Sequence, residues 1–129
     1  KGKFKKLLKP NEKLLIDGCH SMASAKNLYN YLKTLKEPIY GIWGMQKNKL
    51  PEQFIKSFNN IFEKLITVPI SNEPNALKVN ELKKIGKKYF STSTANNIQT
   101  ALKRISSKTN KTIVIFGSLY LVGEVLNKN

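Results

Sequence analysis

Short, continuously apolar runs alternate along this sequence with longer stretches in which apolar residues recur at helical spacing. The runs are Leu14–Ile16, Ile39–Gly44, Leu65–Val68, a brief Tyr89–Ser91 and Thr112–Phe116. A strand that is apolar throughout is buried on both faces, which is typical of parallel sheets covered by helices. The alternation therefore predicts an α/β fold with a mostly parallel sheet of five or six strands and helices on both faces.

The stretches between these runs predict five helices. Ser21 offers an N-cap for the first helix and Pro38 stops it, and Pro51 suits the first position of the second. The expected apolar faces are Met22–Leu35, Phe54–Leu65, Val79–Ile85 ending at Gly86, Ile98–Ile105 capped by Ser93 or Thr94, and Leu119–Leu126.

Charge and composition exclude several functional classes. The chain has 23 Lys and Arg against 8 Asp and Glu, but 22 of the 23 are Lys and only Arg104 is Arg. Lysine without arginine favours a solvated surface over a specific nucleic-acid site, because Arg makes the bidentate contacts to bases and phosphates. No apolar run approaches the length of a membrane span. The single cysteine, Cys19, fits a reducing, cytoplasmic setting.

A length of 129 residues predicts one domain. Residues 1–12 are basic and contain Pro10, so we expect an incoming linker or edge segment, followed by the domain proper at residues 13–129. The chain begins Lys1–Gly2–Lys3, without Met or an apolar leader, and we expect it to be part of a longer protein.

Unusual residues follow three of the predicted strands. Asp17, the only Asp, and His20, the only His, come after the first strand. Lys49 follows the second strand, and Ser118 and Tyr120 follow the last one, after the turn at Gly117. Ligands of open parallel sheets bind beyond the carboxyl ends of the strands, where the first N–H groups of helices also favour anions. We therefore expect Asp17, Gly44 and Gly117 to share one edge of the sheet.

Other chemistries lack their motifs. The sequence contains neither G-x-x-x-x-G-K-[ST] nor G-x-G-x-x-G, so it has no phosphate-binding loop of either kind. Cys19 has no base expected within reach, which argues against a nucleophilic thiol. Trp43 lies inside an apolar run and is expected in the core.

At the same three strand ends the sequence resembles the carboxy-terminal domain of the folylpolyglutamate synthase/dihydrofolate synthase family, which belongs with the Mur ligases. Gly117–Val125 reads Gly-Ser-Leu-Tyr-Leu-Val-Gly-Glu-Val, as in the family, and Asp17–Ser21 resembles Asp-Gly-Ala-His-Asn. Gly44–Leu50 resembles Gly-Met-x-x-Asp-Lys-Asp, and Gly2–Lys3 resembles an upstream Gly-Arg. The resemblance covers nearly the whole chain and implies a single Rossmann-like domain.

The resemblance implies an ATP-dependent ligase that adds L-glutamate to a folate or dihydropteroate carboxylate through an acyl phosphate, with ATP and Mg²⁺ as cofactors of the full enzyme. By carry-over, Asp17 and His20 would be catalytic, and Lys3, Asp17 and Lys49 would bind the nucleotide. His20, Ser118 and Tyr120 would bind glutamate, and no metal ligand is assigned to this chain. The partner would be an amino-terminal P-loop ATPase domain, in cis or as a separate chain, and without it we expect the isolated chain to be inactive.

The sequence departs from the family pattern at several positions. Ser21 replaces Asn, Asn48 and Leu50 replace two Asp residues, Lys3 replaces Arg, and Asn75 stands where an Arg is common. Two alternatives therefore stay open. One is another Mur-type amide ligase domain, and the other is a non-catalytic basic interaction module left by gene splitting.

Overall fold

The computed structural model describes residues 7–105, 107 and 109–128. Five strands form one parallel sheet in the order β1-β5-β2-β3-β4. Their bounds are β1 Glu12–Asp17, β2 Ile39–Trp43, β3 Phe62–Thr67, β4 Thr92–Thr94 and β5 Lys111–Phe116. The predicted fold class is thus confirmed, with β5 inserted between the two strands that open the chain.

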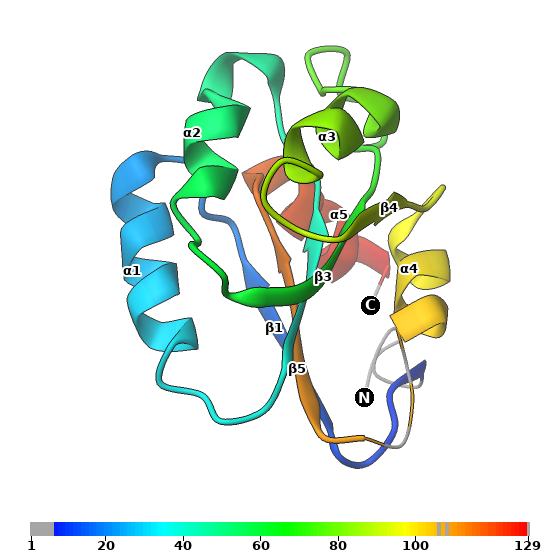
Figure 1. The fold of residues 1–129 in the computed structure, drawn as a ribbon. Helices are drawn as coiled ribbons and strands as arrows, with labels where there is room; N and C mark the ends of the chain where they lie inside the picture. The colour runs from blue at the N-terminus through cyan, green and yellow to red at the C-terminus, as the bar shows by residue number, and fades with distance from the viewer. Residues whose placement is uncertain (1–6, 106, 108, 129) are drawn as a thin grey trace.

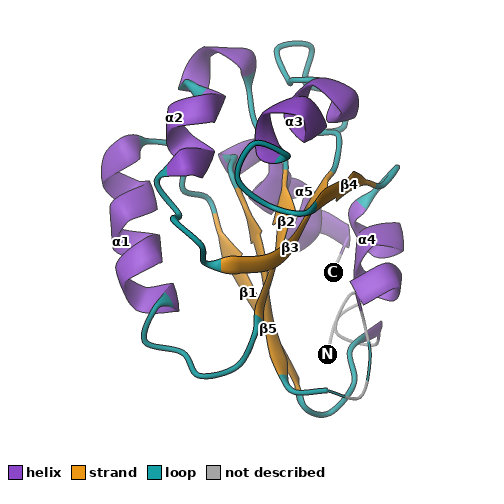
Figure 2. Cartoon of the chain, in the orientation of Figure 1, coloured by secondary structure: helices purple, strands orange, loops and turns teal. Residues whose placement is uncertain are grey.

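The helices alternate with the strands and cover both faces of the sheet (Figures 1 and 2). Their bounds are α1 Met22–Leu32, α2 Pro51–Lys56, α3 Val79–Gly86, α4 Ile98–Ile105 and α5 Leu119–Lys128, with a short 3-10 turn η2 at Lys47–Lys49. No helix among the described residues combines the length and the apolar character needed to cross a bilayer.

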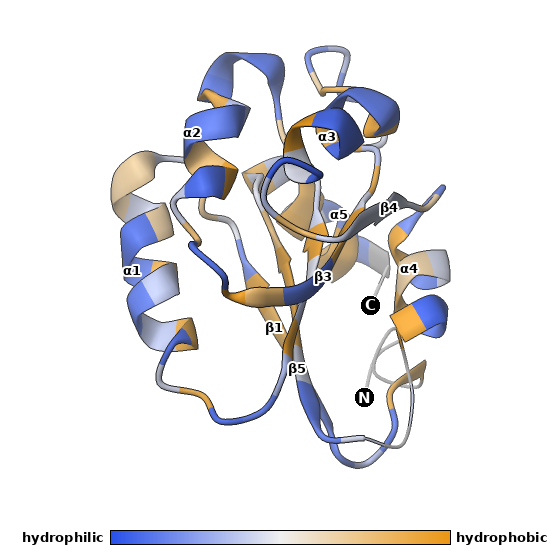
Figure 3. Cartoon of the chain, viewed as in Figure 1, coloured by the Kyte–Doolittle hydropathy of each residue, from blue (hydrophilic) through white to orange (hydrophobic). Residues whose placement is uncertain are grey.

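Each face of the sheet has its own apolar core. Residues of α1, α2 and α3 pack on one face around a group of aromatic rings, in which Phe54, Phe58, Phe62 and Phe116 contact one another. Residues of α4 and α5 pack on the other face against the isoleucines of β2, β3 and β5. Figure 3 shows the strands largely orange and much of α2 and α3 blue, as expected for amphipathic helices on a buried sheet.

The predicted length of the second helix is wrong, because α2 ends earlier than its apolar stripe suggested. The apolar stripe that was expected to continue to Leu65 belongs to a helix only as far as Lys56, and β3 begins at Phe62. The chain turns at Asn60, whose φ is 60°. Phe58 and Phe62 still face the same core, with ring centroids 5.4 Å apart, so the helical pattern persists after the helix has ended.

Two smaller predictions near the fourth strand are also wrong. The strand lies at Thr92–Thr94 rather than Tyr89–Ser91, because Tyr89 and Phe90 are held in a turn by hydrogen bonds to the Gly86 carbonyl. The fourth helix begins at Ile98, and its first turn is closed by Asn97, whose Oδ1 accepts from the Thr100 N–H at 2.7 Å. Neither Ser93 nor Thr94 is its cap, since both belong to β4.

The incoming segment is tied to the end of the sheet opposite to the strand exits. Glu12 Oε2 lies 3.0 Å from Lys111 Nζ, and both side chains are fully buried. The Glu12 carboxylate also accepts from the N–H groups of Lys9 and Ser107 at 2.8 and 2.7 Å. Leu7 and Leu8 pack against the core of the second face. The division of the chain at residue 12 stays a prediction.

Candidate functional site at the carboxyl edge of the sheet

Three strand exits lie side by side at the carboxyl edge of the sheet. Asp17 of β1 and Trp43 of β2 both pair with Phe116 of β5, so the three strands end in register. The Gly44 N–H donates to the Phe116 carbonyl at 3.3 Å. Asp17, Gly44 and Gly117 therefore share one edge, as expected from the sequence.

The connections leave this edge in opposite directions. The chain runs from β1 and β2 to α1 and α2 on one face, whereas it runs from β5, which lies between them, to α5 on the other. Where neighbouring strands of an open α/β sheet connect to helices on opposite faces, a crevice forms at the strand ends, and ligands bind there. The topology thus singles out the region around β1, β5 and β2 as the candidate site.

The turn at Gly117 requires glycine. Its φ is +110°, and a Cβ there would collide with the Gly44 carbonyl oxygen and the Trp43 indole. A side chain at this position would therefore push apart β5 and β2 at the crevice. Trp43 is fully buried, as predicted, and stacks on Phe54 with ring centroids 6.5 Å apart.

The exit of β1 is a compact polar turn. Asp17 Oδ1 accepts from the Cys19 N–H at 2.8 Å, which fixes one carboxylate oxygen toward the backbone. The Cys19 side chain is buried, and burial, reinforced by the negative charge of Asp17, raises the pKa of its thiol far above the ordinary value. A thiol held protonated in this way is a poor nucleophile, in agreement with the sequence argument.

The next two residues begin α1. The Ser21 hydroxyl accepts from the Ser24 N–H at 3.2 Å, and the Ser24 hydroxyl accepts in turn from the Ser21 N–H at 3.1 Å, which makes a capping box. His20 is half-buried, and its Nδ1 is buried without a hydrogen-bond partner among the described residues. A buried imidazole nitrogen without a partner is costly and marks a position that a ligand can satisfy.

Ser118 and Tyr120, the two hydroxyl residues that follow β5, differ in burial and in hydrogen bonding. Ser118 is buried, and its Oγ accepts from the N–H groups of Tyr120 and Leu121 at 3.0 and 3.4 Å, so it caps α5. Tyr120 is 58% exposed. It lines a cleft of about 650 Å³ together with Ser71, Asn72, Leu119, Gly123, Glu124 and Asn127. Of the two, only Tyr120 faces open space in this structure.

The exit of β2 is held by a distant loop. The Lys47 N–H donates to the Asn75 carbonyl at 2.9 Å, and Gln46 Nε2 donates to Glu73 Oε2 at 3.0 Å. The side-chain amide of Asn75 donates to Asn48 Oδ1 at 3.2 Å. These bonds position Lys49, which is half-buried at the end of η2 beside the strand edge.

Some expected site residues are not brought together. Lys3 lies outside the described residues, so its proposed role stays a prediction. Within the described part of the chain, no three His, Cys, Asp or Glu side chains are grouped closely enough to hold a metal ion.

Sequence reasoning missed the contribution of the loop after β3. Ser71 donates its N–H to Glu124 Oε1 at 3.1 Å, and Asn72 has a φ of 59° beside the Tyr120 cleft. No motif in the sequence points to this loop. The one available signal was Glu124, which lies in the motif Gly117–Val125.

Comparison with known proteins agrees with this architecture. The family model described as dihydrofolate synthetase, C-terminal domain, matches residues 1–128. Comparison with curated proteins finds no match.

Several solved structures share the fold. Folylpolyglutamate synthase of Thermotoga maritima is 27% identical, with a TM-score of 0.72 over 85% of this chain and 26% of that one. The Mycobacterium tuberculosis enzyme, solved with ADP and AMPPCP, is 21% identical, with a TM-score of 0.75 over 85% and 28%. E. coli FolC in complex with ADP is 16% identical, with a TM-score of 0.79 over 98% and 30%.

The chain thus spans between a quarter and a third of the length of these proteins. The family model covers all but the last residue of the chain. The chain belongs to the dihydrofolate synthetase carboxy-terminal domain family.

Proposed function

We propose that this domain serves an ATP-dependent ligase that joins L-glutamate to a folate or dihydropteroate carboxylate. The observation that supports the proposal is the register of β1, β5 and β2, in which Asp17 pairs with Phe116 directly before the Gly117–Ser118 turn. Support also comes from related structures, since E. coli FolC has been solved with DHPP and ADP, and the Yersinia pestis enzyme with AMPPNP and a Mn ion.

The chemistry needs an activated carboxylate. ATP supplies it by phosphorylation, after which the glutamate amine displaces phosphate to form the amide. In water the activated species would hydrolyse, so a second domain that closes over the site both orients the amine and excludes solvent. This domain is proposed to close over a P-loop ATPase domain, which would hold the phosphates and Mg²⁺.

We propose a separate role for each candidate residue of this domain. The Asp17 carboxylate, which accepts from the Cys19 N–H, is proposed to hold a ribose hydroxyl. His20 is proposed to meet the acyl phosphate or the incoming glutamate, since its buried Nδ1 needs a partner. Lys49 is proposed to attract the nucleotide phosphates, and Lys3 would do the same.

The glutamate pocket is proposed to lie at the amino end of α5. The Ser118 hydroxyl keeps the first turn of α5 in place and retains a hydrogen that it can donate to a carboxylate. Tyr120 offers an exposed hydroxyl in the adjoining cleft. The N–H groups of the first helical turn favour an anion at this position.

The test is glutamate ligation by a protein that joins this domain to a P-loop ATPase domain of the same family. Formation of ADP and a glutamylated product from dihydropteroate or tetrahydrofolate would support the proposal. A two-domain protein that folds, binds ATP and ligates a different amino acid would favour another Mur-type ligase instead. A folded two-domain protein that forms no amide with any amino acid would contradict the proposal.

A further inference from the structure

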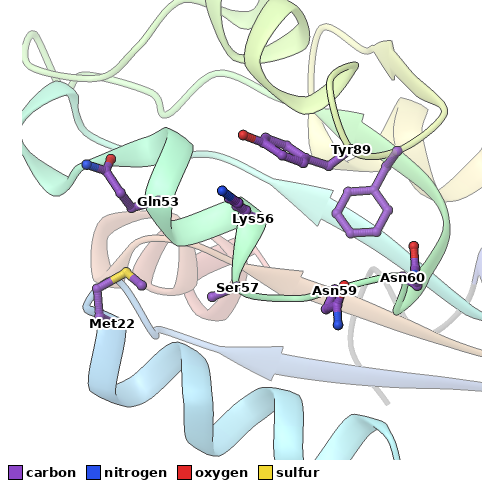
Figure 4. Close-up of a pocket in the computed structure, with 8 residues that line it drawn as sticks. Met22, Gln53, Lys56, Ser57, Asn59, Asn60 and Tyr89 are labelled. Carbon is purple, nitrogen blue, oxygen red and sulfur yellow. The ribbon is translucent and has the colours of Figure 1, made fainter.

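The cleft lined by Tyr120 differs in charge from the rest of the surface. Its volume is about 650 Å³, and Glu124 is the only ionised side chain among the described residues that line it. The chain has 23 Lys and Arg against 8 Asp and Glu, yet none of the basic residues belongs to this lining. By contrast, the hollow beside α2 in Figure 4 is lined by Lys56 and by no carboxylate. The Tyr120 cleft is therefore a negatively charged hollow on a lysine-rich protein.

The Glu124 carboxylate is held in place but not neutralised. Its Oε1 accepts from the Ser71 N–H at 3.1 Å, which ties the loop after β3 to α5. The ion pairs found in the described part of the chain do not involve Glu124, so no lysine there offsets its charge. Glu124 is half-buried. A cation that enters the cleft would meet this carboxylate partly shielded from water and salt, where attraction is stronger than at an open surface.

Helix α5 presents the polar groups of the cleft from one face. Tyr120, Glu124 and Asn127 are spaced by four and three residues, so their side chains follow one another along that face. Leu121 and Val125, on the other side of the helix, are fully buried in the core. The core thus fixes the orientation of α5 and, with it, the direction in which the hydroxyl, carboxylate and amide are offered to the cleft.

The wall of the cleft is open at Gly123. This residue lies inside α5, where glycine is less favourable than alanine. A Cβ built there would have no neighbouring heavy atom within 4 Å, so packing within the domain does not require the glycine. The missing side chain leaves space in the cleft directly beside Glu124. A small molecule can approach the helix at this point.

We propose that Glu124 binds the α-ammonium group of the incoming L-glutamate and so orients the amino acid; this inference rests on the proposed ligase function. Ammonium and carboxylate groups form strong, charge-assisted hydrogen bonds. Glu124 would repel both carboxylates of the substrate, whereas the amino end of α5 at Ser118 attracts an anion. The two charges along α5 therefore select the direction in which glutamate enters, with its amine in the Tyr120 cleft.

The test compares glutamate with glutarate, which has the same two carboxylates but no amine, in the two-domain protein. The variant is Glu124→Gln, whose amide oxygen can still accept from the Ser71 N–H. We expect the KM for glutamate to rise roughly ten- to a hundredfold, with a smaller change in kcat. The inhibition constant of glutarate should not rise. Glu63→Gln is the matched control, because Glu63 is exposed near the amino end of β3 and its change alters the net charge equally.

A second variant tests the location of the amine independently of charge. Gly123→Leu should fill the open wall of the cleft and raise the KM for glutamate, whereas Gly123→Ala, which adds only the Cβ, should change it little. Both variants are expected to fold, because a side chain at this position meets no neighbouring atom at its Cβ and both residues favour a helix.

The outcomes separate this inference from the proposed function. If the two-domain protein ligates glutamate and Glu124→Gln leaves the KM unchanged, the inference is wrong and the proposed function stands. Equal weakening of glutamate and glutarate, or an equal effect of Glu63→Gln, would also overturn it, since the carboxylate would then act through packing or net charge. A wild-type two-domain protein that ligates no glutamate would overturn both. Partial unfolding of a variant lowers kcat rather than raising KM, so the comparison of the two ligands remains decisive.

Discussion

Leu50 has a left-handed backbone conformation, which is unfavourable for leucine. Its φ is 51°, its side chain is 58% exposed, and it precedes α2 without making a capping hydrogen bond. The left-handed region is unfavourable for leucine and is tolerated by Asp and Asn, and the resemblance implies an Asp at this position.

We expect Leu50→Asp to stabilise the domain by about 1 kcal/mol, because it relieves the backbone and places a negative charge at a helix amino end. Leu50→Ala is the control, since it removes the exposed side chain but keeps the unfavourable φ. Urea denaturation of the three proteins measures the difference. A stability of Leu50→Asp equal to that of Leu50→Ala would show that the backbone at this position is not strained.

Two departures from the family pattern contact each other. Asn75 Nδ2 donates to Asn48 Oδ1 at 3.2 Å, where the resemblance implies an Arg and an Asp. A neutral amide pair thus occupies the place where the resemblance implies two opposite charges, and we expect the two positions to be energetically coupled.

The double variant Asn48→Asp/Asn75→Arg should therefore be more stable than the sum of its single variants predicts. We expect a coupling of about 0.5 kcal/mol, the usual size for an exposed ion pair. A double-mutant cycle in urea measures it, and the coupling should shrink at high salt. Strict additivity at low salt would mean that the two side chains do not interact in solution.

At the scale of the elements, the buried pair of Glu12 and Lys111 joins β1 to β5 at the end of the sheet away from the crevice. Lys111 Nζ also contacts the Ser107 hydroxyl and lies 5.6 Å from the centroid of the Tyr40 ring. A buried ion pair contributes little net stability, but removal of one partner leaves the other charge uncompensated.

Lys111→Met should lower the free energy of unfolding by about 3–5 kcal/mol. The double variant Glu12→Leu/Lys111→Met should recover part of that loss, because no charge is then buried. Lys13→Met, at an exposed position of β1 next to Glu12, is the control and should change little. If Lys111→Met proves as stable as the control, the pair is not buried in solution.

The elements differ in how far the sequence predicts them. The buried strand β5 is apolar from Ile113 to Phe116, and the structure confirms the predicted strand, which is buried on both faces. The end of α2 could not be predicted, since Phe58 and Phe62 keep helical spacing after the chain has turned at Asn60. β4 is short and polar, so its position depends on pairing with β3.

The candidate site, too, could be predicted from the sequence in part and not in part. The common edge of Asp17, Gly44 and Gly117 followed from the rule that parallel strands end together. The loop from Ser71 to Asn75 could not be placed, because its bonds to Glu124 and Asn48 join positions 53 and 27 residues apart. Such contacts exist only once the sheet has formed, and no local pattern encodes them.

At the scale of the whole molecule, the chain contains only part of the proposed machinery. It spans 26–30% of the related structures and has no phosphate-binding loop motif. Phosphate transfer needs preorganised backbone N–H groups, a lysine and a metal ion around the phosphates.

We therefore expect the isolated chain to hydrolyse no ATP, with or without folate and glutamate. Phosphate release, compared with a heat-denatured sample, measures this. Folate-dependent release above that background would mean that the domain binds and activates ATP without a P-loop partner.

The most direct test of the account is Asp17→Ala in the two-domain protein, measured as both the glutamate-ligase rate and the thermal midpoint. Loss of one preorganised polar contact costs about 3–4 kcal/mol of transition-state stabilisation, so the rate should fall roughly a hundred- to a thousandfold. The midpoint should change little, since Asp17 lies at a strand end and its bond to Cys19 is a local turn. An unchanged rate at an unchanged midpoint would contradict the assignment of the carboxyl edge as the ligase site.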